Sequence, residues 1–574
     1  MTKLVISIAG SSGTGIESSS EVLMRFLASR WYWLCANREY PSVIKGGCAH
    51  VSIQIWEEEM YTQTQTTRIG IGLGKVGLER CMEMVMSWWT IIHTFERWER
   101  GMPTLQTRAE ENAITLIYVP CRELLKSLWA SYFFENSIVL GAVARLCGIP
   151  REEVCAAFRM QYGKKESVRQ SNLACLEAGY ALDIDALYTF PVLPMNKQRV
   201  LLDGNTALAL GAIQAWVRAF YAYPMSPSSS ILDVLADTAM RTGMVVKQVE
   251  DEITAVQMTI GSMYAGTRAL TATSWGWFDL MTESVSLSGM IEVPLVIVLA
   301  QRPGPATGLP TRTAQGDLRL AIHGGHGEFA RIVVAVSDQH SAYTLIQHAF
   351  NYAETFQLPV IVLTDKEIAD QKKTVSWLND DILIERGLVT DTLLLQWLTP
   401  SDRYAHTESG VSLRRIPGSS PAYYFSNGDE HSEDGTLDES PAVWAMIAKR
   451  IKKRTSILAS LPDPVRYGSE TPDHIFVGRG STKMSMLECL QRAVQNGRKI
   501  AYVHIERLRP LKTEFLKTIF ANGTPFTVIE NNATGQLATL LQQELAMPIH
   551  NRLCKRNGRQ WNVDEVIAYI QTLV

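Results

Sequence analysis

Several patterns that commonly carry function are missing from this sequence of 574 residues. Its nine cysteines stand singly and form no C-x-x-C pair, which excludes a disulfide framework and the common spacings of iron–sulfur and structural zinc sites. The formal net charge is −3, whereas nucleic-acid-binding proteins usually carry an excess of basic residues. We therefore expect reduced, mostly structural thiols, no metal site of the chain's own and no nucleic-acid partner.

A membrane-spanning segment is also missing. The most apolar run, "IEVPLVIVLA" at 291–300, is much shorter than the ~20 residues that a helix needs to cross a bilayer. The N-terminus, "MTKLVISIAGSSGTG", has one lysine and a short apolar run that ends in glycines. This pattern is typical of a strand entering a turn and not of a signal peptide, so we expect a cytoplasmic protein without membrane contact.

The composition is that of a globular protein, with 46% hydrophobic and 20% charged residues. At ~150 residues per domain, the length predicts roughly three or four domains. Apolar strand patterns alternate regularly with helical patterns through the middle of the chain and again near both ends, as in sheets with helices on both faces. The predicted fold class is α/β, with several open, mostly parallel sheets flanked by helices.

Changes in this alternation predict the domain boundaries. The stretch "FPVLPMNKQRVLLDGN" has two prolines and separates two patterned regions. A later polar, turn-rich stretch is longer than most loops of compact enzymes, and such loops are usually functional or interfacial. We predict an α/β domain over 1–192, a second over 193–390, an irregular interface segment over 391–460 and a C-terminal α/β domain over 461–574.

A glycine turn, formed by Gly10, Gly13 and Gly15, lies between the first predicted strand and the first predicted helix. Glycines there let the backbone approach a phosphate at the helix N-terminus. The dinucleotide pattern is G-x-G-x-x-G, but the order here is G-x-x-G-x-G, with Glu39 where a ribose-binding acid would stand. Two interpretations are open: a dinucleotide site, or a tight turn that needs positive φ angles.

Three acids, Glu250, Asp251 and Glu252, stand where a predicted strand becomes a predicted helix. The simpler interpretation is that they stabilise the helix dipole from its first turn. The helix that follows has few charges, however, so it is expected to be largely buried, with at least one of the acids facing the interior. A carboxyl in a poorly hydrated place is a usual proton donor or acceptor.

A run rich in arginine and threonine, "AQRPGPATGLPTRTAQGD" at 300–317, follows a predicted buried strand. In open α/β sheets, ligands bind at this carboxyl edge. The guanidinium of Arg302 suits a carboxylate, and hydroxyls such as that of Thr311 add directed hydrogen bonds; a solvated surface loop is the alternative. The next stretch, "HGGHGEF", offers His323 and His326 at a spacing that only weakly supports a metal site.

The stretch "YAYPMSPSSS" places Pro224 and Pro227 around Ser226. A proline disfavours helical geometry in the residue before it, so this turn is expected to be rigid before any ligand binds. Ser230 and Asp233 together resemble a capping box that starts the next helix. We predict that the rigid turn holds the Ser226 hydroxyl in place.

Taken in order, six segments resemble one family. They read "DGNTALALGAIQA", "YAYPMSPSSSILDVL", "QVEDEITAVQMTIGSMYAG", "TATS…FDLMTESVSLSGM", "QRPGPATGLPTRTAQGDL" and "HGEFAR". They resemble the α subunit of the thiamine-diphosphate-dependent 2-oxoacid:ferredoxin oxidoreductases, most of all the 2-oxoglutarate type. "REYPSVIKGG" and the N-terminal turn resemble the family's γ domain, here fused ahead of α, and "GRGSTK" and "ENNATGQL" resemble its transketolase-C-like domain.

The resemblance implies roles for particular residues. The family's Y-P-I-T-P turn corresponds to the run that starts at Tyr223 and Pro224, with Ser226 in the threonine position. This turn would contact the cofactor, and the Ser226 hydroxyl would also contact the 2-oxoacid. Glu252 resembles the family's cofactor-activating glutamate, which binds the aminopyrimidine ring of thiamine diphosphate. Arg302 and Thr311 match the family's carboxylate-binding arginine and threonine, and residues 193–390 would form the pyrimidine-binding domain.

The implied reaction converts a 2-oxoacid, coenzyme A and oxidised ferredoxin to acyl-CoA, carbon dioxide and reduced ferredoxin. The reverse carboxylation, as in a reductive tricarboxylic acid cycle, is also open. This chain has no G-D-G…N motif for magnesium and diphosphate. The resemblance therefore implies a β subunit that completes the thiamine diphosphate–Mg²⁺ site and carries a [4Fe–4S] cluster, in an (αβ)₂ heterotetramer that reduces ferredoxin.

Some residues depart from the family pattern. Where the family reads T-A-T-S-G-P-G-F, Trp275 and Trp277 replace glycines and would shape a pocket or pack at a subunit interface. Gly325 stands where relatives often carry arginine.

The sequence leaves alternatives open both for the substrate and for the class of protein. The 2-oxoacid would be 2-oxoglutarate, pyruvate or a branched-chain acid, and the candidates for a second anchor to a dicarboxylate are Arg312, His323, His326 and Lys45. A nicotinamide-dependent dehydrogenase that uses the glycine turn and a catalytically idle assembly subunit are the alternatives outside this family.

Overall fold

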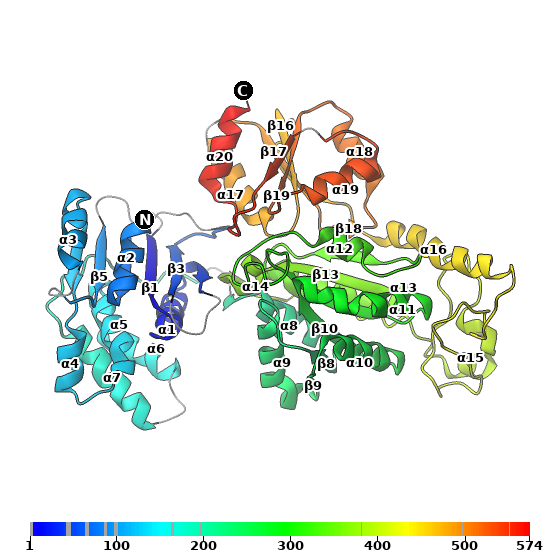
Figure 1. Ribbon diagram of the computed structural model, residues 1–574, viewed down its shortest axis with the longest axis horizontal. Helices are drawn as coiled ribbons and strands as arrows, with labels where there is room; N and C mark the ends of the chain where they lie inside the picture. Colours follow the sequence, from blue (N-terminus) through cyan, green and yellow to red (C-terminus); the bar gives the residue numbers. More distant parts are fainter. Residues whose placement is uncertain are drawn as a thin grey trace. The chain divides into compact units, whose positions relative to one another are not determined.

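The computed structural model describes residues 4–41, 47–62, 68–84, 89–96, 101–161, 166–195, 198–379, 382–495, 497–549 and 551–573. Lys45, one candidate for a second substrate anchor, lies outside these residues. The chain divides into two compact units, Met1–Leu202 with Gln371–Trp377, and Asp203–Asp370 with Leu378–Val574. Figure 1 labels their helices and strands. Within the described ranges no helix is long and apolar enough to span a membrane.

The first unit contains an eight-stranded sheet with the order β6-β5-β4-β1-β3-β2-β14-β7. Its first four strands in this order run parallel, and each of the remaining pairs is antiparallel. The strands are β1 (Leu4–Ser11), β2 (Trp33–Glu39), β3 (Cys48–Trp56), β4 (Ile69–Leu73), β5 (Thr90–His93), β6 (Thr115–Tyr118), β7 (Arg199–Leu202) and β14 (Lys372–Ser376).

The mixed character of this sheet has a simple cause. A parallel pair needs a crossover of about a dozen residues or more, and the connection from Glu39 to Cys48 is too short for one, so β2 and β3 pair antiparallel. Residues Gln371–Trp377, which lie within the predicted domain 193–390, belong to the first unit and contain β14. The helices of the unit are α1 (Ile16–Ser29), α2 (Gly74–Met84), α3 (Met102–Glu111), α4 (Cys121–Ser127), α5 (Glu135–Leu146), α6 (Arg151–Gln161) and α7 (Glu166–Tyr180).

The second unit contains a seven-stranded sheet with the order β18-β12-β13-β11-β10-β8-β9. All its pairs are parallel except that of β18 with β12. The strands are β8 (Ala219–Ala222), β9 (Val245–Gln248), β10 (Ala269–Ser274), β11 (Leu295–Gln301), β12 (Ile332–Ala335), β13 (Pro359–Asp365) and β18 (Arg507–Arg509). The central strands β11 and β13 are buried along their whole length, as expected for a parallel sheet covered on both faces.

Helices flank this sheet, and three of them begin at an aspartate that accepts a hydrogen bond from a backbone N–H. Asp203, Asp251 and Asp338 accept from residues three positions further on, at 2.8, 2.7 and 2.7 Å. Such N-caps satisfy donors that the helix leaves unpaired. The helices are α8 (Gly204–Gln214), α9 (Ser229–Thr242), α10 (Glu252–Tyr264), α11 (Thr282–Met290), α12 (Leu318–His323), α13 (Gln339–Phe356) and α14 (Lys366–Asp370).

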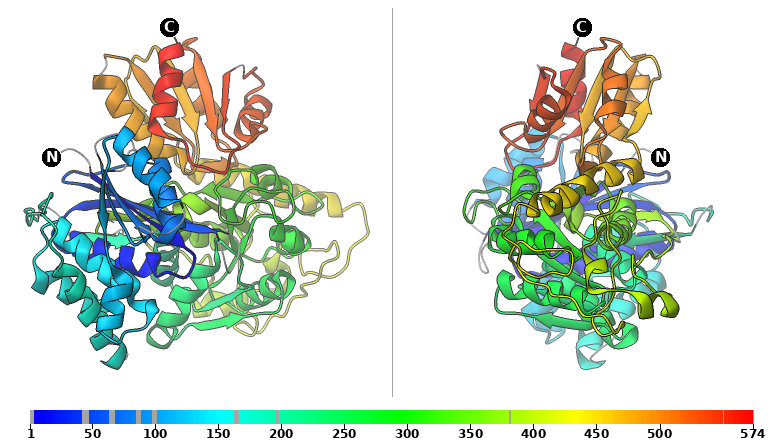
Figure 2. Two further views of the ribbon diagram at one scale, coloured as in Figure 1. Left: turned by 60° about the vertical axis from the view of Figure 1, so that its left-hand side comes forward. Right: turned by 90° about the vertical axis from the view of Figure 1, so that its right-hand side faces the viewer.

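The C-terminal part of the second unit, orange to red in Figure 2, contains a five-stranded sheet with the order β15-β17-β16-β19-β20. Only β15 runs antiparallel to its neighbour. The elements are β15 (Val465–Gly468), β16 (His474–Gly478), β17 (Ile500–His504), β19 (Phe526–Glu530), β20 (Asn551–Cys554), α17 (Thr482–Gln495), α18 (Thr513–Phe520), α19 (Gln536–Leu545) and α20 (Val563–Thr572). The α/β class with several open sheets is confirmed.

A polar stretch connects the two sheets of the second unit. It contains α15 (Thr392–Trp397) and α16 (Val443–Ser460). Buried ion pairs attach α16 to the turn before β11, since Lys449 and Lys453 each approach Glu292 to 2.5 Å. Burial alone would raise the pKa of Glu292, but the two ammonium groups lower it below its usual range. The polar stretch that looks like a loop in sequence is therefore attached to the sheet through the buried ion pairs of α16.

Candidate functional site

The residues predicted to form a site lie at one edge of the seven-stranded sheet. Its neighbouring strands β11, β10, β8 and β9 are parallel, so their carboxyl ends meet at the same edge. Arg302 follows β11, Trp275 follows β10, Ser226 follows β8 and Glu252 follows β9. This edge is where open α/β sheets bind ligands.

The turn after β8 is held by several hydrogen bonds. The hydroxyls of Ser228 and Ser274 both donate to the carbonyl of Met225, each at 2.9 Å. The amide of Asn205 donates to the carbonyl of Pro227 and to the hydroxyl of Ser230, both at 2.7 Å. These contacts fix the backbone around the half-buried Tyr223, Pro224 and Ser226. Asn205 and Ser274 were not among the residues predicted from the sequence, although both are polar, fully buried and at the end of an element.

The predicted capping box at the start of α9 is wrong. The helix begins at Ser229 after Ser228, which makes no side-chain cap, and the Ser230 hydroxyl accepts from Asn205 instead of capping the helix. The reason is tertiary: a buried amide competes for the hydroxyl that the local pattern assigns to a cap.

The acids after β9 have three different environments. Asp251 is the N-cap of α10, and the carboxylate of Glu250 accepts from the Thr254 hydroxyl at 3.1 Å. Glu252 is only 1% exposed, and its Oε1 is buried with no hydrogen-bond partner among the described residues. Burial raises the pKa of Glu252, and the charge of Asp251 raises it further. The interior acid that the sequence predicted is therefore Glu252.

Arg302 is enclosed where β11 ends. Its side chain is 4% exposed, and Nη1 donates to the carbonyl of Ser226 at 2.8 Å. The guanidinium carbon lies 3.9 Å from the centre of the Trp275 ring. Burial lowers the pKa of Arg302, while the nearby Asp317 raises it. The structure thus joins two predicted residues, Ser226 and Arg302, by a direct hydrogen bond.

The segment after Arg302 holds Thr311 half-buried, and it is anchored further on by Gln315. The Gln315 amide donates to the carbonyl of Arg479 at 2.9 Å, and the backbone N–H of Asn531 donates to its oxygen at 3.1 Å. His323 and His326 are both exposed. Throughout the described ranges, no group of three or more His, Cys, Asp or Glu residues is arranged to hold a metal ion.

Asp317 is a charged residue of this edge that the sequence analysis did not select. Its backbone N–H donates to Gln301 Oε1 at 3.3 Å, and its Oδ2 is buried and has no hydrogen-bond partner within the described part of the chain. Burial raises the pKa of Asp317 to about 7, against the lowering effects of the Arg479 and Arg302 charges. The environment of Asp317 could not be predicted from its neighbours in sequence, because Arg479 belongs to the C-terminal part of the chain.

This environment predicts a pH dependence of stability. Because the folded pKa of Asp317 is raised, its contribution to the free energy of unfolding is present in full below about pH 4 and falls as pH rises to about 7. We expect Asp317→Asn to remove this fall, so that the variant unfolds at a higher temperature than the parent above pH 7. Thermal unfolding across pH 4–8 measures the difference, and equal slopes for the two proteins would contradict it. Asp279→Asn is the companion variant: because the Asp279 charge raises the pKa of Asp317, its removal should shift the fall to lower pH.

The N-terminal glycine turn has a structural explanation. Gly13 and Gly15 have φ angles of 89° and 77°, and a Cβ at Gly15 would meet the Asn136 side chain at 2.4 Å. A tight turn packed against Asn136 therefore requires these glycines.

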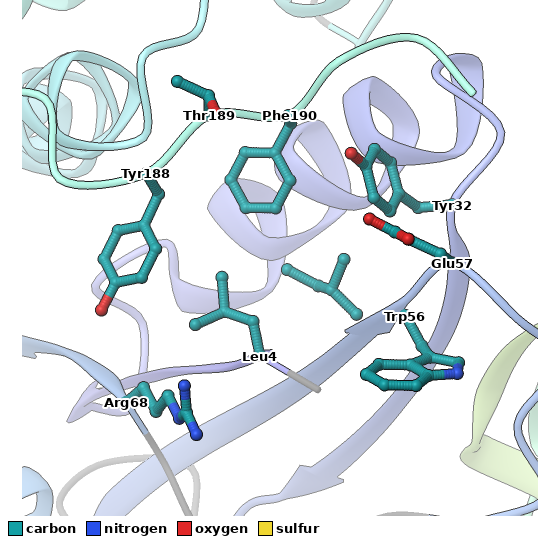
Figure 3. A pocket seen from close by; sticks show the side chains of 9 residues that line it. Leu4, Tyr32, Trp56, Glu57, Arg68, Tyr188, Thr189 and Phe190 are labelled. Carbon is teal, nitrogen blue, oxygen red and sulfur yellow. The ribbon is translucent and has the colours of Figure 1, made fainter. Parts of the chain in front are cut away.

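The first unit also has a cavity of about 150 Å³. In Figure 3 the side chains of Leu4, Tyr188 and Phe190 surround it, with Arg68 and Glu57 on opposite sides. Its lining is Leu4, Tyr32, Ile55, Trp56, Glu57, Arg68, Tyr188, Thr189 and Phe190. None of the glycines of the N-terminal turn belongs to this lining, so the cavity does not support a ligand site at that turn.

Known families match both units. A family described as "Pyruvate flavodoxin/ferredoxin oxidoreductase, thiamine diP-bdg" matches residues 210–449, which include Ser226, Glu252 and Arg302. A second, described as "Pyruvate ferredoxin/flavodoxin oxidoreductase", matches residues 5–182. These matches and the fold define the class of the protein, an oxidoreductase with a thiamine-diphosphate-binding domain.

Individual relatives narrow this class. A 2-oxoacid:ferredoxin oxidoreductase subunit alpha of Saccharolobus solfataricus is 29% identical over 629 residues, covering 99% of this chain and 97% of the relative. The 2-oxoglutarate synthase subunit KorA of Methanocaldococcus jannaschii is 30% identical over 323 residues, covering 56% of this chain and 85% of the relative. A solved structure of 2-oxoglutarate:ferredoxin oxidoreductase from Magnetococcus marinus, with 2-oxoglutarate, coenzyme A and succinyl-CoA bound, covers 100% of both chains with a TM-score of 0.89 and 27% identity. This chain belongs to the family of 2-oxoacid:ferredoxin oxidoreductase α subunits, as its sequence resemblance predicted.

Proposed function

We propose that the chain is the α subunit of a 2-oxoglutarate:ferredoxin oxidoreductase. It would convert 2-oxoglutarate, coenzyme A and oxidised ferredoxin to succinyl-CoA, carbon dioxide and reduced ferredoxin, with reductive carboxylation as the reverse. The observation that carries the proposal is the buried carboxyl of Glu252 at the carboxyl edge of the sheet, whose Oε1 has no hydrogen-bond partner among the described residues. The named ligands of the Magnetococcus marinus structure support the choice of substrate.

Glu252 fits the role of the cofactor-activating acid. When bound, thiamine diphosphate supplies the nucleophilic carbon that attacks a 2-oxo group. A buried carboxyl with a raised pKa can hold a proton against a ring nitrogen of an aminopyrimidine, which a solvated carboxylate would not do at neutral pH. Tyr223 and Pro224, on the rigid turn after β8, would pack against the same ring.

The substrate would be held by the groups that converge on this edge. Arg302 would bind the carboxylate next to the 2-oxo group, and its guanidinium is already oriented by the Ser226 carbonyl. The hydroxyls of Ser226 and Thr311 would complete the anion site. Because Arg302 is buried, its attraction for a carboxylate is weakened little by solvent.

The proposal includes a partner. The relatives are named as subunits alpha, and a β subunit would supply the Mg²⁺–diphosphate half of the cofactor site and a [4Fe–4S] cluster, in an (αβ)₂ assembly that reduces ferredoxin. In this arrangement 1–192 is the γ-like domain, 193–390 binds the pyrimidine half of the cofactor, 391–460 is an interface segment and 461–574 is the transketolase-C-like domain.

Co-production of the chain with its β subunit tests the proposal. We expect the brown complex to reduce ferredoxin with 2-oxoglutarate and coenzyme A, with a higher kcat/KM than for other 2-oxoacids. The chain purified alone should contain no iron and show no turnover. Turnover by the chain alone, or failure of the complex with every 2-oxoacid, would contradict the proposal. Pyruvate is the second candidate substrate because both matching families are described as pyruvate oxidoreductases, and the same assay compares the two acids.

A variant of the proposed carboxylate anchor adds a sharper readout. Arg302→Lys keeps the charge but loses the planar fork that orients a carboxylate. We expect the KM for the 2-oxoacid to rise about 10- to 100-fold, with a smaller change in kcat, as expected for the loss of one charged hydrogen bond. Steady-state kinetics of the complex measure both constants, and an unchanged KM would exclude Arg302 as the anchor. Arg319→Lys, an exposed arginine on α12, is the control and should match the parent.

A further inference from the structure

Trp275 adopts a backbone conformation that its side chain does not favour. It follows β10 directly, and its φ angle is 47°, in the left-handed region that suits glycine. The side chain is nevertheless only 8% exposed. A bulky residue keeps such a backbone only where its surroundings hold it, and such positions gather at functional sites.

The surroundings of Trp275 are the proposed carboxylate anchor. Its ring centre lies 3.9 Å from the guanidinium carbon of Arg302. A Cβ at Gly304 would lie only 2.8 Å from the indole Nε1, so the ring also lies close to the backbone at Gly304. The ring of Trp277 meets Trp275 edge-on, with ring centres 6.5 Å apart at 85°. The indole therefore occupies the space along one face of Arg302.

This position has a consequence for substrates. If a 2-oxoacid places its carboxylate on Arg302, the carbons nearest to that anchor are C2 and C3. A group packed against the guanidinium crowds these carbons first and the distant end of the substrate last. The Trp275 ring and the 2.8 Å hydrogen bond from Nη1 to the Ser226 carbonyl together fix the orientation of the guanidinium.

We propose that Trp275 is a specificity-determining residue that restricts the site to 2-oxoacids unbranched at C3. This inference rests on the proposed function and narrows its substrate class. Pyruvate, 2-oxobutanoate and 2-oxoglutarate meet the restriction, and 3-methyl-2-oxobutanoate does not. One methyl group in a fitted pocket changes kcat/KM by about 10- to 200-fold, so the discrimination is measurable.

The test compares 2-oxobutanoate with 3-methyl-2-oxobutanoate, two acids that differ by a single methyl group at C3. We expect the complex of the parent chain with its β subunit to favour the unbranched acid by about tenfold or more. Trp275→Gly removes the ring and suits the left-handed backbone, and it should reduce this ratio of kcat/KM values at least about tenfold. Trp275→Phe, which keeps the core packed with a smaller ring, should reduce it by an intermediate factor.

Trp216→Gly is a matched control. Trp216 also has a positive φ, of 63°, and its ring lies 5.3 Å from the guanidinium carbon of Arg218, but it is 62% exposed before β8. In this variant the ratio of kcat/KM for 2-oxobutanoate to kcat/KM for 3-methyl-2-oxobutanoate should not change. An unchanged ratio in Trp275→Phe and Trp275→Gly, or an equal change in Trp216→Gly, would overturn the inference. If the Gly variant does not fold, the Phe variant alone decides. If the parent complex is active on none of the 2-oxoacids, the proposed function is overturned instead.

Discussion

Replacing Glu252 with glutamine is expected to reduce turnover of the α–β complex by about 10²- to 10⁴-fold, the usual range for loss of a positioned acid or base. Glutamine keeps the size of the side chain but cannot hold or release a proton. The Oε1 of Glu252 is buried and makes no hydrogen bond to any described residue. Ferredoxin reduction with 2-oxoglutarate and coenzyme A measures the loss.

Glu250→Gln is the matched control, because Glu250 stands two residues earlier and is exposed. It should leave turnover within about twofold of the parent, as for a surface change away from the site. A Glu252→Gln complex with parental activity would exclude the role of Glu252 and favour an idle subunit.

The stability of the Glu252→Gln chain gives a readout that needs no cofactor. The folded pKa of Glu252 is raised, so the parent is destabilised as pH rises from the unfolded pKa through the folded one. The variant should therefore unfold at a higher temperature than the parent at pH 8 and at nearly the same temperature at pH 4.

The largest loss of stability is expected from Glu354→Gln. The Glu354 carboxylate is 1% exposed and lies 2.6 Å from Arg268, 2.9 Å from Arg386 and 2.7 Å from Arg414. Neutralising it leaves buried guanidinium groups without their counter-charge, which costs about 3–5 kcal/mol when a buried pair is broken. Urea unfolding measures the change.

Glu385→Gln is the control for this variant. Glu385 is exposed, and its carboxylate accepts a 3.4 Å hydrogen bond from the Thr355 hydroxyl. Its effect should stay within about 0.5 kcal/mol. A loss below about 1 kcal/mol for Glu354→Gln would show that the guanidinium groups reach solvent when the carboxylate is neutral.

The sequence allowed the location of Arg302 to be predicted, and also the burial of at least one acid among Glu250, Asp251 and Glu252, because both follow from local pattern. A helix with few charges must be buried, and a residue that follows a buried parallel strand must lie at the carboxyl edge of its sheet. The packing of Trp275 on Arg302 could not be predicted in this way. It joins the ends of two strands, and the sequence showed only that a tryptophan stands in an unusual place.

Contacts between distant parts of the chain explain the other differences. Burial raises the pKa of Asp317 although the charge of Arg479, from the C-terminal part of the chain, lowers it, and the Ser230 hydroxyl accepts a hydrogen bond from Asn205. No pattern within a short window contains either pair. The mixed pairing of the first sheet follows in part from a short connection, but the return of the chain as β14 does not.

That return makes the two units topologically inseparable. β14 pairs with β2 and with β7, and it is the link between them in the first unit's sheet. A fragment that ends at Leu202 would lose this link and expose the edge of β2, which invites pairing with other chains. The first unit is therefore not a removable module, because its sheet is completed by seven residues, Gln371–Trp377, that lie far downstream in the sequence.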